Sequence, residues 1–144
     1  MKPLKVVFDT NILVMVAGMP GRYVDYWLGF AKPPKNKFTL FTSPPILAET
    51  QRKLEEVIQF DRLIAVEYIE EIKTIDTVVN PKIKLNAVPT DPDDNHILEC
   101  AVEAGADIII SADKDLIHLK NFRGIQIIHP SNLKYIFRYL ENEN

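Results

Sequence analysis

The sequence contains few cysteine and histidine residues. Among its 144 residues are one cysteine, Cys100, and three histidines, His96, His118 and His129. A single cysteine excludes an intramolecular disulfide and a cysteine-rich zinc site. The histidines are scattered along the chain, which disfavours a zinc site built from histidine.

Long hydrophobic runs are also lacking. No apolar stretch approaches the roughly 20 residues that cross a bilayer, and residues 1–5 do not open a signal-peptide core. The composition, 47% hydrophobic and 26% charged, is typical of a globular protein with an ordinary core. We therefore expect one domain over residues 1–144, frayed at 141–144, in a soluble cytoplasmic protein that does not enter a membrane.

Several sequence motifs of phosphate and acyl chemistry are missing as well. There is no Gly-x-Gly-x-x-Gly after a predicted strand, no Walker loop and no Gly-x-Ser-x-Gly elbow. The first acidic turn, Asp9-Thr10-Asn11, lacks the second aspartate that aspartyl-phosphate chemistry uses. A net charge of −3 without a basic cluster disfavours a protein that coats nucleic acid.

Short β-branched or apolar runs alternate with stretches in which apolar residues recur every three or four positions. The first pattern predicts strands and the second predicts helices. Strands are predicted at 4–8, 38–42, 107–111 and 125–128, helices at 12–17, 22–31, 44–58, 62–79, 94–104 and after residue 131, and a short edge segment at 83–89. This alternation indicates an α/β fold with a central, mainly parallel sheet.

Two of these predicted helices have apolar faces that should pack on the sheet. Val57 and Ile58 complete the face of the helix at 44–58, and Leu63 and Val66 begin the face of the next helix. We expect Val57 and Ile58 to be buried, and Leu63 and Val66 to form one helical series with Ile69.

The stretch 91–116 (DPDDNHILECAVEAGADIIISADKDL) brings two acids to one edge of such a sheet. Asp94 opens a helix that Gly105 ends, and Asp113 follows a buried strand. Helix starts and strand ends face the same edge of a parallel sheet, where ligands bind. Asp94 also shares the inward face of Ile97. The alternative is that Asp94 is only a helix cap and Asp113 a turn former.

Two further acids should reach the same edge. Asp9 follows the first predicted strand, and Thr10 or Asn11 is available to cap the next helix. Glu49 lies near the start of the helix that follows the second strand. The alternative for Glu49 is an exposed side chain that only favours the helix dipole.

Four carboxylates at one edge repel each other, which raises their pKa values unless a cation lies between them. No lysine or arginine is obviously placed there, because neighbours such as Asp113 and Lys114 point apart. A hard divalent ion held by oxygen atoms, Mg²⁺ or Mn²⁺, is the simplest solution. Without the four acids the chain would have a net charge of +1, so its mild acidity is compatible with a polyanionic substrate. Metal ions among carboxylates beside a phosphodiester are typical of nucleases.

Taken in order, these motifs resemble those of the PIN-domain nucleases, over nearly the whole chain. The likeness is greatest to the VapC-like toxin components of toxin–antitoxin pairs. It implies a three-layer α/β/α sandwich and cleavage of RNA that depends on Mg²⁺ or Mn²⁺. The motifs are Val7-Phe8-Asp9-Thr10-Asn11, Glu49 in the helix after the second strand, Asp91-Pro92-Asp93-Asp94-Asn95 and Ser111-Ala112-Asp113-Lys114-Asp115-Leu116.

The resemblance also implies roles for single residues and for partners. RNA is the expected substrate, family members often form homodimers, and the toxins are blocked by an antitoxin protein. Asp93 would replace Asp94 if the register shifted by one. Ser111 stands where many members have threonine. The expected catalytic acids and metal ligands are Asp9, Glu49, Asp94 and Asp113, with support from Asn11, Ser111, Asp91 and Asp115.

Three lysines are candidates for contacts with substrate phosphates. Lys35 and Lys37 lie in a proline-rich loop, and Lys114 follows the last catalytic acid. A solvated loop is the alternative for the first two.

Two other functions stay open. A PIN scaffold that only binds RNA or a protein should have lost some of its acids, and this chain retains all four. A structure-specific DNA nuclease of related fold usually carries more acids and appended DNA-binding helices, which a compact chain without a basic cluster does not suggest. The leading interpretation is therefore a metal-dependent endoribonuclease.

Overall fold

The computed structural model describes residues 3–27, 38–89, 91–133, 135 and 138. Within these residues, six strands form one sheet in the order β3-β2-β1-β4-β6-β5. Neighbouring strands are parallel except β5 and β6, which confirms the predicted, mainly parallel sheet. The strands are β1 (Leu4–Phe8), β2 (Phe38–Thr42), β3 (Thr77–Val78), β4 (Ile108–Ile110), β5 (Asn121–Phe122) and β6 (Ile125–Ile128).

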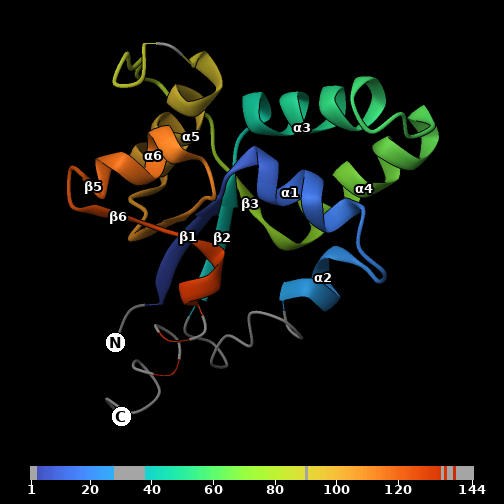
Figure 1. Ribbon diagram of the computed structural model, residues 1–144, viewed down its shortest axis with the longest axis horizontal. Coiled ribbons are helices and arrows are strands. Elements are labelled where there is room, and N and C mark those ends of the chain that lie inside the picture. The colour runs from blue at the N-terminus through green and yellow to red at the C-terminus, as the bar shows by residue number, and fades with distance from the viewer. Residues whose placement is uncertain (1–2, 28–37, 90, 134, 136–137, 139–144) are drawn as a thin grey trace.

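Helices cover both faces of the sheet and complete the α/β/α sandwich (Figure 1). On one side lie α1 (Thr10–Ala17), α2 (Tyr23–Asp25) and α4 (Arg62–Ile75), and on the other α5 (Pro92–Ala104) and α6 (Lys114–Leu119). Helix α3 (Pro44–Glu56) packs beside α1 and α4, and a short 3₁₀ helix covers Pro130–Asn132. No helix in the described part of the chain is long and apolar enough to span a membrane.

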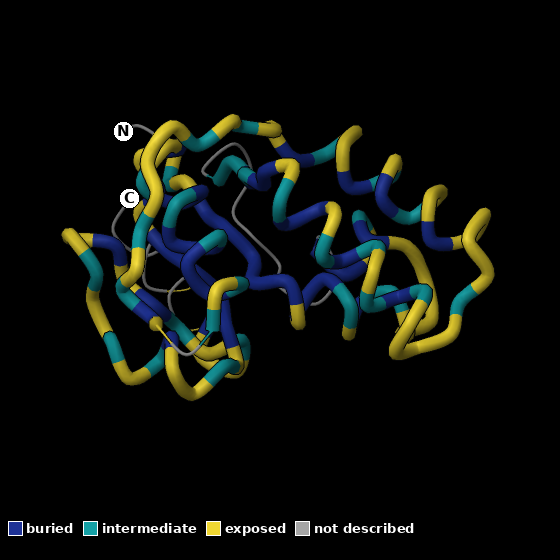
Figure 2. The backbone as a smooth tube through the Cα atoms, turned by 90° about the horizontal axis from the view of Figure 1, so that it is seen from above, coloured by how far each residue is buried: buried dark blue, intermediate teal, exposed yellow. Residues whose placement is uncertain are grey.

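Val6–Phe8 of β1 and Ile108–Ile110 of β4 are apolar and buried because helices cover the sheet on both faces. Val6 of β1 and Ile109 of β4 are fully buried, as are Leu13 of α1 and Leu98 of α5, and all four belong to one core. Figure 2 shows buried residues along the strands and inner helix faces, with exposed residues at the outer turn between α3 and α4. This rigid core fixes where the strands end, and therefore where the residues that follow them lie.

Helix α4 is shorter than the predicted helix at 62–79, so that prediction is wrong at its end. The helix stops at Ile75, and β3 follows at once and pairs with β2. Thr77, Val78 and Val79 are β-branched and favour an extended backbone. The N–H of Val79 donates to the carbonyl of Thr42 over 2.9 Å, which continues the pairing.

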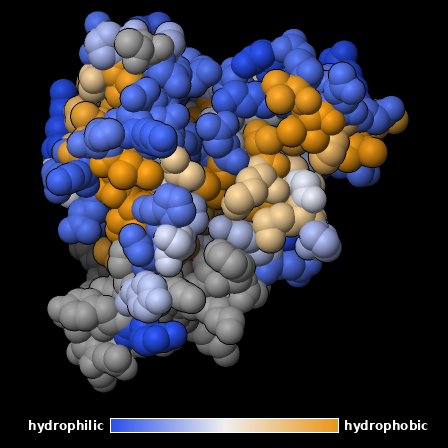
Figure 3. Space-filling model, in the orientation of Figure 1, coloured by the Kyte–Doolittle hydropathy of each residue, from blue (hydrophilic) through white to orange (hydrophobic). Residues whose placement is uncertain are grey.

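The predicted burial of Val57 and Ile58 is also wrong, and the apolar residues that begin α4 are exposed as well. Val57 is 66% exposed, Ile58 45%, Leu63 77% and Val66 37%. Helix α3 ends at Glu56, so these residues lie at the end of the helical pair, beyond what the sheet covers. Figure 3 shows hydrophobic surface over this part of the molecule. Helical periodicity defines an apolar face but not the length of the layer that covers it.

The segment 83–89 is not the edge strand that its sequence suggests. Its backbone donors bond side chains of α5 in place of a neighbouring strand: the N–H of Leu85 donates to Glu99 over 2.8 Å, and that of Val88 donates to Asn95 over 3.0 Å. These bonds use the groups that a β-ladder would need.

Some predicted features lie outside the described residues. They include residues 28–31 of the helix predicted at 22–31, the candidate contacts Lys35 and Lys37, and residues 139–144.

Candidate metal centre

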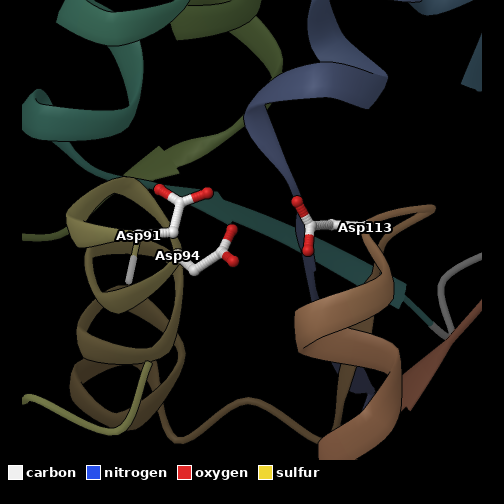
Figure 4. A group of neighbouring side chains, drawn as sticks. All are labelled: Asp91, Asp94 and Asp113. Atoms are coloured by element: carbon white, nitrogen blue, oxygen red, sulfur yellow. The ribbon is translucent and has the colours of Figure 1, made fainter. Parts of the chain in front are cut away.

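Three carboxylates meet where α5 and α6 begin. Asp91 is the N-cap of α5, Asp94 lies in the first turn of that helix, and Asp113 is the N-cap of α6. One oxygen from each residue lies within 4.8 Å of those of the other two. Figure 4 shows the carboxylates of Asp94 and Asp113 pointing toward each other from the two helices. Among the described residues, this acidic trio is the group of acids close enough to share one metal ion.

Helix capping explains why Asp91 and Asp94 have different roles. The carboxylate of Asp91 accepts a hydrogen bond from the N–H of Asp93 over 3.0 Å, and Pro92, in the first turn, has no N–H to satisfy. Since Asp91 is the cap, the alternative in which Asp94 caps this helix is wrong. Asp94 is one turn further on, with its side chain toward Asp113.

Asp113 combines a structural contact with a place in the trio. Its Oδ1 accepts hydrogen bonds from the N–H groups of Asp115, over 2.8 Å, and Leu116, over 3.4 Å. The alternative of a turn-forming role is therefore confirmed, but that role uses only one of the two oxygens. The other oxygen makes no bond to the described part of the chain, and a cation could use it.

Asp94 is the most strongly perturbed member of the trio. It is 3% exposed, and its Oδ2 is buried without a hydrogen-bond partner in the described part of the chain. Its pKa is raised to about 8, mainly by burial and then by the charges of Asp113 and Asp91. A buried charged oxygen without a partner is unfavourable unless a cation offsets its desolvation. This atom is the observation that best fits a bound metal ion.

Asp9 lies beside the trio and is tied to it through Ser111. The hydroxyl of Ser111 donates to Oδ2 of Asp9 over 2.7 Å and accepts from the N–H of Asp113 over 3.0 Å. Burial raises the pKa of Asp9, the Ser111 hydrogen bond lowers it, and the charge of Asp113 raises it again. Asp9 is the N-cap residue of α1 but makes no side-chain capping bond, so neither Thr10 nor Asn11, which the sequence offered as possible caps, caps this helix.

Glu49 lies near these acids but is paired with bases. Arg52 bonds both of its oxygens, one over 3.1 Å, and Nζ of Lys53 lies 3.9 Å from Oε1. Arg52 is the main reason that the pKa of Glu49 is lowered. The prediction that no lysine or arginine is placed near the acids is therefore wrong. Glu49 also affects Asp93. The pKa of Asp93 is raised mainly by burial and next by the charge of Glu49.

The remaining candidates lie around this centre. Asn11 is exposed and accepts a hydrogen bond from Nζ of Lys53 over 3.0 Å. Asp115 and Lys114 are exposed at the start of α6, and the charge of Asp115 adds to the rise in the pKa of Asp94. Sequence reasoning missed Lys53, although its place one helical turn after Glu49 was a usable signal.

The donors of this centre suit a hard divalent cation. The trio and Asp9 offer only oxygen atoms, which Mg²⁺ and Mn²⁺ prefer over zinc-like ligand sets. Carboxylates that repel each other in a partly buried pocket gain most from such an ion. The residues present therefore fit a metal ion, and such a centre beside a phosphodiester is suited to hydrolysis.

Comparisons with known proteins concern the family and the fold. A sequence model of the PIN domain matches residues 5–115. No curated protein matches the sequence. Among solved structures, PAE2754 from Pyrobaculum aerophilum is 13% identical, with 94% of this chain and 90% of that chain covered and a TM-score of 0.61. VapBC2 from Rickettsia felis, bound to a DNA fragment from their promoter, is 14% identical, with 88% and 98% covered and a TM-score of 0.62.

The two structural similarities concern the fold, since both identities are low. The domain match is broader evidence, because it covers most of the chain and spans every motif from Asp9 to Asp113. It confirms the resemblance seen in the sequence. The chain therefore belongs to the PIN-domain family, and this membership indicates a nuclease.

Proposed function

We propose that the protein is an endoribonuclease that depends on Mg²⁺ or Mn²⁺. The observation that carries this proposal is Oδ2 of Asp94, a buried carboxylate oxygen without a hydrogen-bond partner in the described chain, next to Asp91 and Asp113. RNA is preferred over DNA because the chain is compact and has no basic cluster for gripping a duplex.

In this proposal, Asp9, Asp94 and Asp113 hold the ion, and Asp91 lies close enough to take part. When bound, the ion would activate a water molecule and neutralise charge on the phosphate. Glu49, fixed by Arg52, would orient that water.

The supporting residues would act through these acids. Ser111 would hold Asp9 in position, because its hydroxyl bonds the Asp9 carboxylate. Asn11 would serve at the entrance on α1, where it is exposed. Asp115 and Lys114 would face the substrate. Hydrolysis would break one P–O bond of the RNA backbone and add the water oxygen to phosphorus.

We further propose a toxin role in the cytoplasm, with an antitoxin protein as the partner that blocks the centre. The likeness of the sequence to VapC-like toxins supports this proposal, and one structure of similar fold is VapBC2. A homodimer is the expected assembly for the same reason. The test is expression in a bacterium: the wild type should arrest growth, and Asp94→Asn should not. Unchanged growth with soluble wild-type protein would remove the toxin role but not the nuclease.

The test of the activity uses the purified protein with labelled single-stranded RNA and Mn²⁺, with and without chelator. We expect cleavage only with the metal, and none by Asp94→Asn. Asp61→Asn is the matched control, because Asp61 is the exposed N-cap of α4 and asparagine caps as well as aspartate. It should cut at the rate of the wild type.

Two outcomes would favour the other candidate functions. Wild-type protein that binds RNA but does not cut it with any divalent metal would be a binding scaffold. Preferential cutting of a DNA of the same sequence would indicate a DNA nuclease.

A further inference from the structure

Lys53 joins two elements at the border of the acidic centre. It lies on α3, and its side chain is only 23% exposed. Its Nζ donates to Oδ1 of Asn11, in the first turn of α1, over 3.0 Å, and lies 3.9 Å from Oε1 of Glu49. The ammonium group is therefore held between the start of α1, which follows Asp9, and the glutamate of α3.

The charge of Lys53 reaches acids on three different elements. Burial raises the pKa values of Asp9 and Asp93, and the positive charge of Lys53 opposes the rise in both. Arg52 lowers the pKa of Glu49 most, and Lys53 adds to that effect. Lys53 thus lies close to Asp9 after β1 and to Asp93 at the start of α5, as well as to Glu49 on its own helix.

A pocket of this charge needs a cation at its border to admit a polyanion. The trio, Asp9 and Glu49 would together carry five negative charges when ionised, and one divalent ion offsets two of them. The remaining charge repels RNA phosphates. A fixed ammonium group at the border would lower that repulsion where the backbone enters.

Arg52 and Lys53 differ in the elements that they bond. Three of the five N–H donors of Arg52 bond the carboxylates of Glu49 and Glu56, the latter over 2.8 Å, so its charge is paired within α3. An ammonium group has three donors. In the described part of the chain, Lys53 makes one hydrogen bond, to Asn11, and the longer ion pair with Glu49. It therefore retains donors for a further anion, and it lies beside α1 as well as its own helix.

We propose that Lys53 binds a backbone phosphate of the RNA beside the acidic centre. This inference rests on the proposed function, because it takes RNA as the ligand. The contact is to the phosphate and not to a base, so it strengthens binding of all sequences to a similar extent. Asn11 and Glu49 hold the ammonium group in position before the RNA arrives.

The test measures binding of a short labelled single-stranded RNA by anisotropy, in chelator, over a series of salt concentrations. All proteins carry Asp94→Asn, so that the RNA stays intact. We expect Lys53→Gln to weaken binding about tenfold at low salt and to reduce the slope of log affinity against log salt by about 0.7. Lys53→Arg should retain both the affinity and the slope.

Lys73→Gln is the matched control, because Lys73 also pairs with a glutamate on its own helix, Glu70, over 3.3 Å. It should leave the affinity and the slope unchanged. Lys53→Met keeps the apolar stem and replaces Lys53→Gln if that variant does not fold. The inference is overturned if Lys53→Gln lowers the melting temperature but not the affinity or the slope, which would make Lys53 a link between helices only.

Cleavage by the protein with Asp94 intact is measured separately. Wild-type protein that binds RNA through Lys53 but does not cut it would overturn the proposed activity and leave this inference standing. Normal cleavage by the wild type, with an affinity and salt slope that Lys53→Gln does not change, would overturn this inference and leave the proposed activity standing. A wild-type protein that binds no RNA would overturn both.

Discussion

The hydroxyl of Ser111 donates to Oδ2 of Asp9 over 2.7 Å and so joins the ends of two neighbouring strands, β4 and β1. Ser111 is fully buried, and Asp9 is 3% exposed. The same hydroxyl accepts from the N–H of Asp113. One small side chain thus fixes two of the acids proposed to hold the metal.

Ser111→Ala should therefore destabilise the protein and impair cleavage. The change leaves a buried carboxylate oxygen and a backbone N–H without their partner, at a cost of about 1–3 kcal/mol. It also removes the hydrogen bond that lowers the pKa of Asp9. Urea denaturation measures the stability, and cleavage of labelled RNA with Mn²⁺ measures the activity.

The matched control is Thr42→Val, at a buried strand residue whose hydroxyl has no hydrogen-bond partner in the described chain. Removing that hydroxyl should leave the free energy of unfolding similar or slightly higher. Equal losses in the two variants would show that the Ser111 hydrogen bond contributes nothing specific.

Leu54 and Leu63 should respond very differently to truncation, although both belong to apolar helical series in the sequence. Leu54 is fully buried on α3, whereas Leu63 is 77% exposed on α4. Leu54→Ala should cost about 2–5 kcal/mol because it opens a cavity in the core. Leu63→Ala should change stability by less than about 0.5 kcal/mol. Urea denaturation of the two variants compares them directly, and a large loss at Leu63 would mean that this surface is covered.

This pair shows which part of the fold the sequence determines. Strands β1, β2 and β6 follow from local composition, because each is a short apolar run between breakers. The exposure of Leu63 does not follow, because it depends on where the opposing layer ends in space. The end of α4 was missed for a similar reason: helical periodicity continues through Thr77 and Val78, and only pairing with β2 makes them a strand.

The candidate site divides in the same way. Asp94 and Asp113 could be predicted to meet because helix starts and strand ends share one edge of a parallel sheet. Which acid caps α5 could not, since Asp91 and Asp94 are both acceptable caps and only the backbone geometry decides. The position of Lys53 beside Asn11 joins residues 42 positions apart, so no local pattern indicates it.

Asp76 should make stability fall as pH rises toward neutrality. It is 6% exposed, and the hydroxyl of Tyr23 donates to its two oxygens over 3.0 and 3.3 Å. Burial raises its pKa from 3.8 to about 7, which the Tyr23 hydrogen bond only partly offsets. Since the pKa is higher in the folded state, the contribution is full below about pH 4 and is lost as pH rises through about 7.

Asp76→Asn should remove that dependence, because asparagine still accepts from Tyr23 but does not ionise. The free energy of unfolding of the variant relative to the wild type should therefore rise between pH 4 and pH 8. Denaturant titrations at several pH values measure it, with Asp61→Asn as the exposed control. A difference that does not change with pH would mean that Asp76 does not titrate in this range.

Asp94→Asn should stabilise the metal-free protein at high pH and abolish its response to metal. The pKa of Asp94 is raised to about 8, first by burial and then by the neighbouring carboxylates. By the same argument, the contribution of Asp94 to wild-type stability is full below about pH 4 and is lost as pH rises through about 8. In chelator at pH 9, the variant should melt roughly 5 °C or more above the wild type, and the gap should close toward pH 4.

Divalent metal should reverse this order, because an ion that binds only the folded state stabilises it. Added Mn²⁺ should raise the melting temperature of the wild type and leave that of Asp94→Asn nearly unchanged. Asp61→Asn should respond to the metal as the wild type does, since Asp61 lies in the turn before α4 and outside the trio. If Mn²⁺ stabilises Asp94→Asn as strongly as the wild type, the ion binds elsewhere, and the buried oxygen of Asp94 does not hold it.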